Sequence, residues 1–247
     1  MGKTKITASE DIKSTFVMIP TYNECENIQL LIDEILSLKI HGLNIVVVDD
    51  NSPDGTWKIV EQMAKRDKRV HLLHRVKDKG RSFAGRAGFL YALEHNADYV
   101  VEMDADFSHQ TKYIPEMLKL MDDYDVVLGS RFVKGGKDLR PGKLRWIISY
   151  LSGFYIRLVF GTSVQDCNSG YRCFRAEALR GIELEKTISG PTPSIVQEIL
   201  YLVAQKGYRI KEIPILFQDR TRGKSTLTFR ALIQGLIDVL RFRMAHR

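Results

Sequence analysis

The sequence predicts an α/β fold in which a mostly parallel central sheet carries helices on both faces. In the first half of the chain, short apolar runs alternate with longer segments whose apolar residues recur at helical spacing. Acidic pairs follow two of these runs, and open α/β sheets bind their ligands at the carboxyl ends of parallel strands. The chain has 247 residues, 44% of them hydrophobic, which is enough for a complete core. We therefore expect one large domain.

The alternation gives the expected elements in order. Each apolar run has the length of a buried strand, and each segment between two runs is long enough to form a covering helix. The predicted strands cover residues 15–20, 44–49, 69–74, 98–104 and 125–130, and the predicted helices cover about 24–38, 56–66, 82–95 and 111–121.

From about residue 139 the alternation stops. Residues 144–160 are rich in apolar and aromatic side chains, but Arg145 and Arg157 leave an uncharged run too short to span a bilayer, so we expect a core or an interfacial helix. Residues 208–217 predict a strand, and Pro214 places that strand at a sheet edge or makes it irregular.

The C-terminal segment has apolar residues at helical spacing from Phe229 to Met244, with arginines between them. This pattern predicts an amphipathic helix that either packs on the domain or docks on a membrane or a partner. Residues 139–160 and 228–247 are therefore the candidate membrane- or partner-contacting helices.

Composition narrows the class of ligand. A formal net charge of +7 favours an anionic ligand: nucleic acid, a phosphorylated substrate or an acidic membrane surface. No basic helix with interleaved aromatic residues occurs, so we do not expect nucleic-acid binding. The cysteines, Cys25, Cys167 and Cys173, lack zinc-like spacing and favour a reducing compartment such as the cytosol. No N-terminal run resembles a signal peptide, and we expect neither export nor acylation.

The acidic pairs are the candidate metal and nucleotide ligands. Asp104 and Asp106 follow the run that begins at Tyr99, and if the extended geometry persists their carboxylates lie on the same side. Such oxygen donors suit Mg²⁺ or Mn²⁺ held jointly with a pyrophosphate better than they suit zinc. Asp49 and Asp50 end the second run, but Asp, Asn, Pro and Gly are also ordinary turn residues, so each pair has a purely structural interpretation.

Several segments, in this order, give the chain a family resemblance. They are Pro20-Thr-Tyr-Asn-Glu24, Asp49-Asp-Asn-Ser-Pro-Asp-Gly55, Asp104-Ala-Asp-Phe-Ser-His109 and Gly129-Ser-Arg-Phe132. The chain resembles the family 2 glycosyltransferases, and within them the polyprenyl-phosphate mannosyltransferases of the dolichol-phosphate type, over about residues 14–227. The resemblance implies a single GT-A catalytic domain over residues 1–247, in agreement with the periodicity.

The resemblance also implies roles for individual residues. It places Asp104 and Asp106 at the metal, and it makes Asp106, Arg131 and Arg220 the catalytic residues. The nucleotide-sugar pocket would be formed by Pro20, Tyr22, Glu24, Val48, Asp50, Asp104, Ala105, Asp106, Arg131 and Arg220. The acceptor phosphate would meet Arg145 and Ser149, with Asp166 and Arg172 as secondary candidates on the acceptor side.

Some of these residues have competing interpretations. Thr21 and Glu24 are spaced as a capping box, so Glu24 could be structural. His109 is the one base candidate near the metal motif, and we favour a structural role for it. Arg131, Arg145 and Arg220 suit phosphate because a planar guanidinium binds two oxygens at once.

The chain departs from the mannosyltransferase pattern at two motifs. In Arg220-Thr-Arg-Gly-Lys-Ser-Thr226 a threonine replaces the usual final lysine, and Lys224 could supply the charge. The segment 79–85, Lys-Gly-Arg-Ser-Phe-Ala-Gly, stands where the mannosyltransferases usually carry a Gly-Leu-Gly element, and it is more similar to the wider family.

The resemblance predicts a metal-dependent, inverting transfer of mannose from GDP-mannose to a polyprenyl phosphate. The protein would act peripherally at the cytosolic face of a membrane, with a small membrane-anchoring subunit as a possible partner. UDP-glucose is the alternative donor. The alternative classes are a catalytically silent binding subunit and a nucleotidyltransferase, which would release pyrophosphate.

Overall fold

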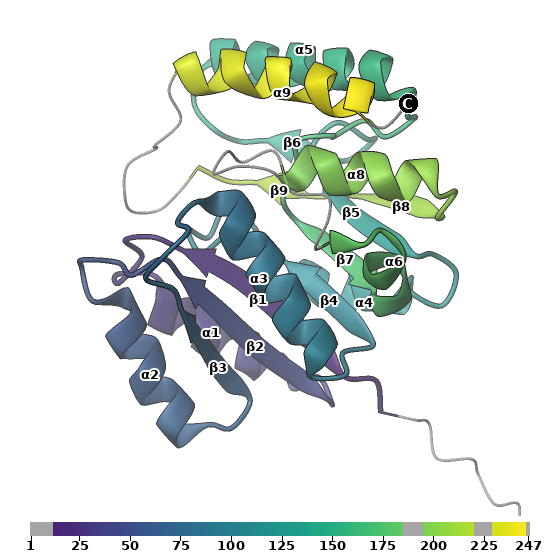
Figure 1. Cartoon of the computed structure of the whole chain (residues 1–247). Coiled ribbons are helices and arrows are strands. Elements are labelled where there is room, and N and C mark those ends of the chain that lie inside the picture. The colour runs from purple at the N-terminus through teal and green to yellow at the C-terminus, as the bar shows by residue number, and fades with distance from the viewer. Residues whose placement is uncertain (1–11, 185–194, 220–228, 246–247) are drawn as a thin grey trace, which may run out of the picture.

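The computed structural model describes residues 12–184, 195–219 and 229–245 (Figure 1). Its central sheet has seven strands in the order β3-β2-β1-β4-β7-β5-β8. The strand bounds are β1 Thr15–Thr21, β2 Leu43–Asp49, β3 Val70–His74, β4 Tyr99–Glu102, β5 Val126–Ser130, β7 Arg172–Arg175 and β8 Ile210–Pro214. All neighbouring strands pair in parallel except β7, which runs antiparallel to both β4 and β5. The expected mostly parallel sheet is confirmed.

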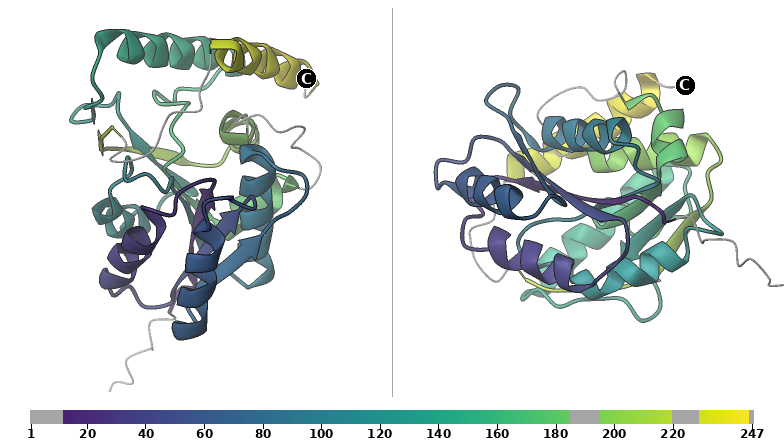
Figure 2. Two further views of the ribbon diagram at one scale, coloured as in Figure 1. Left: turned by 90° about the vertical axis from the view of Figure 1, so that its left-hand side faces the viewer. Right: turned by 90° about the horizontal axis from the view of Figure 1, so that it is seen from below.

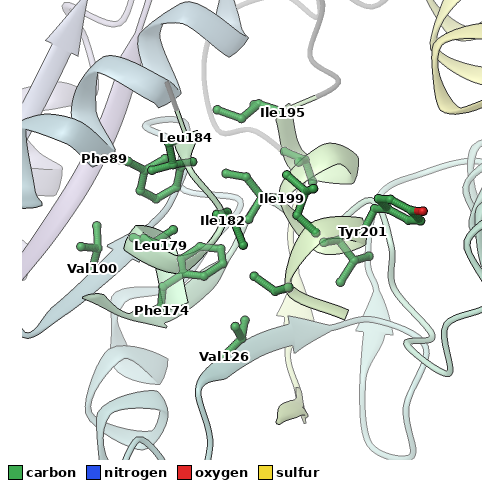
Figure 3. Close-up of a cluster of buried hydrophobic side chains, with 14 of the residues drawn as sticks. Phe89, Val100, Val126, Phe174, Leu179, Ile182, Leu184, Ile195, Ile199 and Tyr201 are labelled. Atoms are coloured by element: carbon green, nitrogen blue, oxygen red, sulfur yellow. The ribbon is translucent and has the colours of Figure 1, made fainter. Parts of the chain in front are cut away.

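Helices cover both faces of this sheet and create two cores. One core lies beneath α1 (Ile28–Ser37), α2 (Thr56–Arg66) and α4 (Ile114–Lys119), which follows the short 3₁₀ turn Thr111–Tyr113. The other lies beneath α3 (Arg81–Glu94), α6 (Ala176–Gly181) and α8 (Ile195–Gln205). Figure 3 shows part of it, with Phe89, Phe174, Ile195 and Ile199 pointing toward a common centre. Because the central strands are buried on both faces, their sequences are continuous apolar runs.

Strand β7 was not predicted from the sequence. Its residues, Arg-Cys-Phe-Arg, have a charged residue at each end and form no apolar run. Strand β8 was predicted, and its position at the sheet edge agrees with Pro214 as its last residue. A second, two-stranded sheet pairs β6 (Lys137–Asp138) with β9 (Leu216–Phe217) in parallel.

The start of the first helix corrects the sequence analysis. Helix α1 begins at Ile28, not near residue 24, with Asn27 at its N-cap position. Thr21 is still in β1, and its hydroxyl donates to Asp49 Oδ2 at 2.8 Å, so it does not cap the helix. The Glu24 carboxylate accepts a hydrogen bond from the side chain of Asn27. The capping-box interpretation of Thr21 and Glu24 is therefore wrong.

Two long helices lie side by side across one end of the molecule (Figures 1 and 2). They are α5 (Lys143–Phe160) and α9 (Phe229–Ala245), and the Tyr155 hydroxyl of α5 donates to the Leu236 carbonyl of α9 at 3.0 Å. Helix α5 buries Gly153, Ile156 and Phe160 toward the domain. Its exposed apolar residues are Leu144, Trp146, Ile147, Ile148, Tyr150, Leu151, Phe154 and Leu158, and α9 adds Ile237, Leu240 and Met244. No described helix combines the length and the apolarity needed to cross a bilayer.

Candidate active site at the carboxyl edge of the sheet

The carboxyl ends of β1 and β2 form one side of the candidate site. These strands pair in register, so that Pro20 lies opposite Val48 and Thr21 opposite Asp49. Asp49 is fully buried and accepts hydrogen bonds from the backbone and hydroxyl of Ser52 and from Thr21. Because its oxygens are used within the protein, Asp49 shapes the turn after β2 and is not oriented toward a ligand.

The loops that follow β1 and β2 are tied together by side-chain hydrogen bonds. The Asp54 carboxylate accepts from the Cys25 backbone at 3.0 Å and from the Thr56 hydroxyl at 2.6 Å. The Thr56 hydroxyl in turn accepts from the Glu24 backbone at 2.9 Å. The turn interpretation of residues 50–55 is confirmed, since Asn51 and Gly55 have φ of 56° and 86°. Tyr22 lies on the outside of this pair of loops with 54% of its surface exposed.

Asp50 is buried but differs from Asp49 in its partners. Arg75 Nη1 lies 2.6 Å from its Oδ1, and the Gly80 backbone donates to its Oδ2 at 2.7 Å. Burial raises the pKa of Asp50, although Gly80 and Arg75 both favour the charged form. The carboxylate is thus held in one orientation between the β2 and β3 loops. Sequence reasoning missed Arg75, because its contact with Asp50 bridges two loops and leaves no local pattern.

The Asp104–His109 loop forms the centre of the site. Strand β4 ends at Glu102, so the alternation of side chains along a strand does not reach Asp104 and Asp106 as expected. The loop is instead shaped by His109, whose Nδ1 accepts the Asp104 backbone N–H at 3.1 Å. Burial lowers the pKa of His109, and its ring stacks on Tyr171 with centroids 4.9 Å apart. A neutral, buried imidazole that accepts a backbone hydrogen bond agrees with the structural role favoured for His109.

The two aspartates of this loop have different exposure. Asp106 is buried, and its Oδ1 accepts the Ser108 backbone N–H at 3.1 Å. The side chain of Asp104 is 41% exposed. Gly170 faces it: a Cβ built on Gly170 would lie 3.9 Å from both Asp104 oxygens. Because Gly170 has no side chain, one approach to the Asp104 carboxylate stays open.

Arg131 forms a bidentate ion pair with Asp166. Its Nε and Nη2 donate to the two carboxylate oxygens of Asp166, each at 2.7 Å, and its backbone N–H donates to the same carboxylate. Its Nη1 lies 3.7 Å from Asp138, and its guanidinium lies over the ring of Phe217. Asp166 is therefore a buried partner of Arg131, which leaves Nη1 as the part of Arg131 oriented away from that pair.

The start of α5 brings the predicted acceptor residues together. Arg145 is largely exposed, with Nη1 3.8 Å from Asp219, and Ser149 lies one turn further along the helix. Arg140 Nη2 donates to the Ser149 hydroxyl at 3.2 Å, while the same guanidinium binds Asp138 in a bidentate pair. Sequence reasoning missed Arg140, although it stands with Lys143 and Arg145 in a basic stretch at a helix N-terminus.

An aromatic cavity of about 380 Å³ links Arg131 to α5. Trp146 and Tyr150 stack in it with centroids 5.3 Å apart, and the edge of Phe132 meets both rings. Arg131 and Asp138 also line it. The lining of the cavity therefore combines charged residues that follow β5 with aromatic residues of α5.

Three of the expected site residues need correction or lie elsewhere. The Val48 side chain is fully buried against α3, where Gly88 leaves room for it, so a contact of Val48 with a nucleoside would use its backbone. Arg172 is buried and donates to the carbonyls of Cys167 and Val196, so it does not face the acceptor. Arg220, with the motif up to Thr226, lies outside the described residues.

The donor set suits a hard divalent cation shared with a ligand. Asp104 and Asp106 supply carboxylate oxygens, and Ala105 between them is buried. No group of three or more His, Cys, Asp or Glu side chains with metal-ligand geometry occurs in the described parts of the chain. Mg²⁺ and Mn²⁺ commonly complete their coordination with substrate phosphates and water, so a pair of carboxylates fits such an ion.

Comparison with known families identifies the chain. The model of the family described as "Glycosyl transferase family 2" matches residues 16–182. The chain belongs to glycosyl transferase family 2. The matched residues include the loops after β1, β2 and β4 and also Arg131, so the candidate site at the carboxyl edge lies within the part of the chain that matches the family.

Curated relatives match this transferase over most of its length. An undecaprenyl-phosphate mannosyltransferase of Micrococcus luteus is 36% identical, over 93% of this chain and 94% of its own. A polyprenol monophosphomannose synthase of Mycolicibacterium smegmatis is 33% identical, over 91% and 85%. A dolichol-phosphate mannosyltransferase of Pyrococcus furiosus is 35% identical, over 91% of this chain and 62% of its own.

Solved structures confirm the GT-A fold of the transferase. Glucosyl-3-phosphoglycerate synthase of Mycobacterium tuberculosis, in complex with Mn²⁺, UDP and glucosyl-3-phosphoglycerate, superposes with a TM-score of 0.67 at 18% identity, over 94% of this chain and 80% of that one. Mannosyl-3-phosphoglycerate synthase of Rubrobacter xylanophilus superposes with a TM-score of 0.64 at 15% identity, over 95% and 74%.

Proposed function

We propose that the protein transfers mannose from GDP-mannose to a polyprenyl phosphate, with inversion at the anomeric carbon. The observation that carries this proposal is the match, at 33–36% identity over more than nine-tenths of the chain, to relatives named as an undecaprenyl-phosphate mannosyltransferase, a polyprenol monophosphomannose synthase and a dolichol-phosphate mannosyltransferase. The carboxyl edge supports it, because it offers carboxylates for a metal-bound diphosphate and cations on the α5 side for a second phosphate.

The reaction is a single displacement. An oxygen of the lipid phosphate forms a bond to the anomeric carbon while the bond from that carbon to the GDP β-phosphate oxygen breaks, and the electron pair leaves with GDP. The second pKa of a phosphate monoester is about 6, so the acceptor is already an anionic nucleophile at pH 7. No side chain has to act as a general base, which fits the buried, neutral His109.

Donor-side residues bind and orient the nucleotide sugar. Asp50, held by Arg75 and Gly80, would accept hydrogen bonds from a ribose or a base, together with Pro20 near the end of β1 and Tyr22 and Glu24 on the loop that follows. Asp104 and Asp106 would hold Mg²⁺ or Mn²⁺, which would neutralise charge on the leaving diphosphate when bound.

Acceptor-side residues lie where the active-site edge meets the two surface helices. Arg140, Arg145 and Ser149 would bind the lipid phosphate at the N-terminus of α5. The aromatic cavity beside them would take the first isoprene groups, and the exposed apolar residues of α5 and α9 would enter the cytosolic face of a membrane. The net charge of +7 favours an anionic lipid surface.

A product assay tests the proposal. The purified protein is incubated with Mn²⁺ or Mg²⁺, undecaprenyl or dolichyl phosphate, and either GDP-mannose or UDP-glucose, and the lipid fraction is analysed by mass spectrometry. We expect mannosyl lipid from GDP-mannose only, lost with a chelator and in Asp106→Asn, which keeps the size of the side chain.

Other outcomes would replace parts of the proposal. Glucosyl lipid from UDP-glucose would overturn the donor. Release of pyrophosphate in place of GDP would indicate a nucleotidyltransferase. Mannosyl lipid formed only after addition of a membrane extract would indicate a requirement for an anchoring subunit, and equal yield from Asp106→Asn would refute the assigned metal site.

A further inference from the structure

Arg81 lies beside the candidate metal ligands without a role in the proposed reaction. It is the first residue of α3, in the segment that departs from the mannosyltransferase pattern. Its Nη2 lies 2.7 Å from Glu102 Oε1 and 3.6 Å from Asp104 Oδ1. The guanidinium therefore stands between a buried carboxylate at the end of β4 and the exposed carboxylate that would bind a metal ion.

The surroundings of Arg81 hold it in this position. Glu102 is 1% exposed, so the anchoring carboxylate is fixed within the protein. Gly85 lies one turn along α3, and a Cβ there would come within 3.2 Å of Arg81 Nη1 and 2.9 Å of Ile195. Gly170 borders the other side, where a Cβ would lie 3.8 Å from Nη2. The glycine at position 85 leaves room for the guanidinium, and Gly170 lies in ordinary van der Waals contact distance on its other side, near the approach to Asp104.

The other charges near Arg81 do not fully cancel its attraction to the Asp104 carboxylate. Arg172 lies opposite Glu102 on the neighbouring strand β7, so a second positive charge acts on Glu102, although its guanidinium donates to the carbonyls of Cys167 and Val196. His109, whose Nδ1 lies 3.9 Å from Asp104 Oδ2, is buried and accepts the Asp104 backbone N–H. In the free protein, Arg81 thus partly neutralises the carboxylate that a metal ion would bind.

We propose that Arg81 makes the binding of the divalent ion and of the nucleotide diphosphate mutually dependent. A positive charge close to Asp104 repels a bare divalent ion, so it weakens metal binding in the absence of nucleotide. The same charge attracts a diphosphate that shares the ion, so it strengthens binding of the nucleotide. Arg81 is thus a positioning residue that favours entry of the metal together with the donor. The inference rests on the proposed function in taking a nucleoside diphosphate as the leaving group.

Binding measurements without turnover test the coupling. Free Mn²⁺ is measured by electron paramagnetic resonance during titration of the protein, with and without GDP. In the wild type we expect GDP to tighten Mn²⁺ binding by about tenfold. In Arg81→Met, which keeps the length of the side chain, we expect Mn²⁺ alone to bind about threefold more tightly and the effect of GDP to fall by about fivefold. Tighter binding of Mn²⁺ alone together with a smaller effect of GDP would separate this role from a structural one. A damaged pocket would weaken both the binding of Mn²⁺ and the effect of GDP.

Further variants complete the test. Arg81→Lys keeps the charge and should retain most of the coupling. Arg86→Leu removes an arginine of the same helix that lies near Phe83 and should leave both affinities unchanged. Equal Mn²⁺ affinities in the wild type and Arg81→Met, or no effect of GDP in the wild type, would overturn the inference. If the coupling is observed but no mannosyl lipid forms, the proposed reaction is refuted and the inference about Arg81 stands.

Discussion

At the scale of single residues, the aspartates at the carboxyl edge of the sheet differ in their hydrogen-bond partners and in their exposure. Asp49 and Asp50 are neighbours in sequence and both are buried. Asp49 is satisfied by Ser52 and Thr21 within its own turn, whereas Asp50 is held by Arg75 and Gly80 from a different loop. Asp104 is partly exposed. The same residue type therefore has three different environments at one edge of the sheet.

Replacement of Asp49 should destabilise the protein more than replacement of Asp104. Asp49→Asn weakens charge-assisted hydrogen bonds in a buried turn, and we expect a loss of about 2 kcal/mol in the free energy of unfolding. Asp104→Asn changes a partly exposed side chain and should cost roughly 0.5 kcal/mol or less. Urea unfolding of both variants checks this, and equal losses would contradict the structural role of Asp49.

Asp138 should make a pH-dependent contribution to stability. Burial raises its pKa, but the hydrogen bonds and charge of Arg140 outweigh burial and hold the pKa below its usual value. A lowered pKa means that the folded state favours the charged form of Asp138. The stabilisation is therefore complete above the pKa of the unfolded state, about 4, and is lost as the pH falls through the pKa of the folded state.

The measurement compares wild type and Asp138→Asn. The difference in their unfolding free energies should be constant from neutral pH down to mildly acidic pH and should shrink below about pH 4. A difference that grows with acidity would show that the Asp138 pKa is raised, against the assignment.

At the scale of elements, α5 combines a buried edge with an exposed apolar surface. Leu151 and Leu158 are 57% and 67% exposed, while Ile156 and Phe160 pack into the core. Leu30 of α1 is equally apolar and 52% exposed, but it lies in a different part of the molecule from α5 (Figure 1). It therefore provides a matched control for surface hydrophobicity.

Charge placed on α5 should weaken membrane binding. Leu151→Glu removes an apolar side chain worth about 1.5–3 kcal/mol on burial, so we expect at least about a tenfold loss of affinity for vesicles that contain phosphatidylglycerol. Leu30→Glu should bind as the wild type does. Sedimentation of the protein with vesicles measures both, and equal binding by the two variants would show that α5 does not enter the membrane.

The elements predicted from sequence are those whose residues carry a local pattern. The runs of β1 and β2 are buried on both faces and apolar throughout, so they were predicted almost to the residue. Strand β7 was missed because its two arginines are paired by tertiary contacts, and α1 was placed too early because Thr21 binds Asp49 across the sheet. Asp104 and Asp106 were found from their motif, whereas Arg75, Arg81 and Arg140 became visible only through contacts between distant segments.

At the scale of the whole molecule, one sheet connects the donor loops to the surface helices. Strand β5 ends beside Arg131, and the chain then passes through β6 into α5, so the acceptor side follows directly from the active-site edge. Figure 2 shows the two surface helices beyond the body of the α/β domain. In the proposed reaction, transfer to a lipid phosphate would therefore take place close to the surface that is proposed to meet the bilayer.

Nucleotide and metal together should stabilise the fold. A ligand at a hundred times its dissociation constant adds about 2.7 kcal/mol, which is roughly 5–10 °C in melting temperature for a domain of this size. We expect this shift with GDP and Mn²⁺ together, a small shift with either alone, and loss of the shared effect in Asp106→Asn. Calorimetry measures the shift in melting temperature. The same shift in Asp106→Asn would show that the metal ion binds elsewhere.

The antiparallel strand β7 has a consequence for how the chain assembles. Strands β4 and β5 are close in sequence, yet they are joined in the sheet only through β7, which is made more than forty residues after β5. Until β7 arrives, the hydrogen-bonding edge of β4 has no neighbour on that side, and β5 is not attached to the earlier strands. The four strands β3-β2-β1-β4 can pair as the chain emerges, whereas closure of the sheet depends on late, long-range contacts and is therefore the slow step of folding.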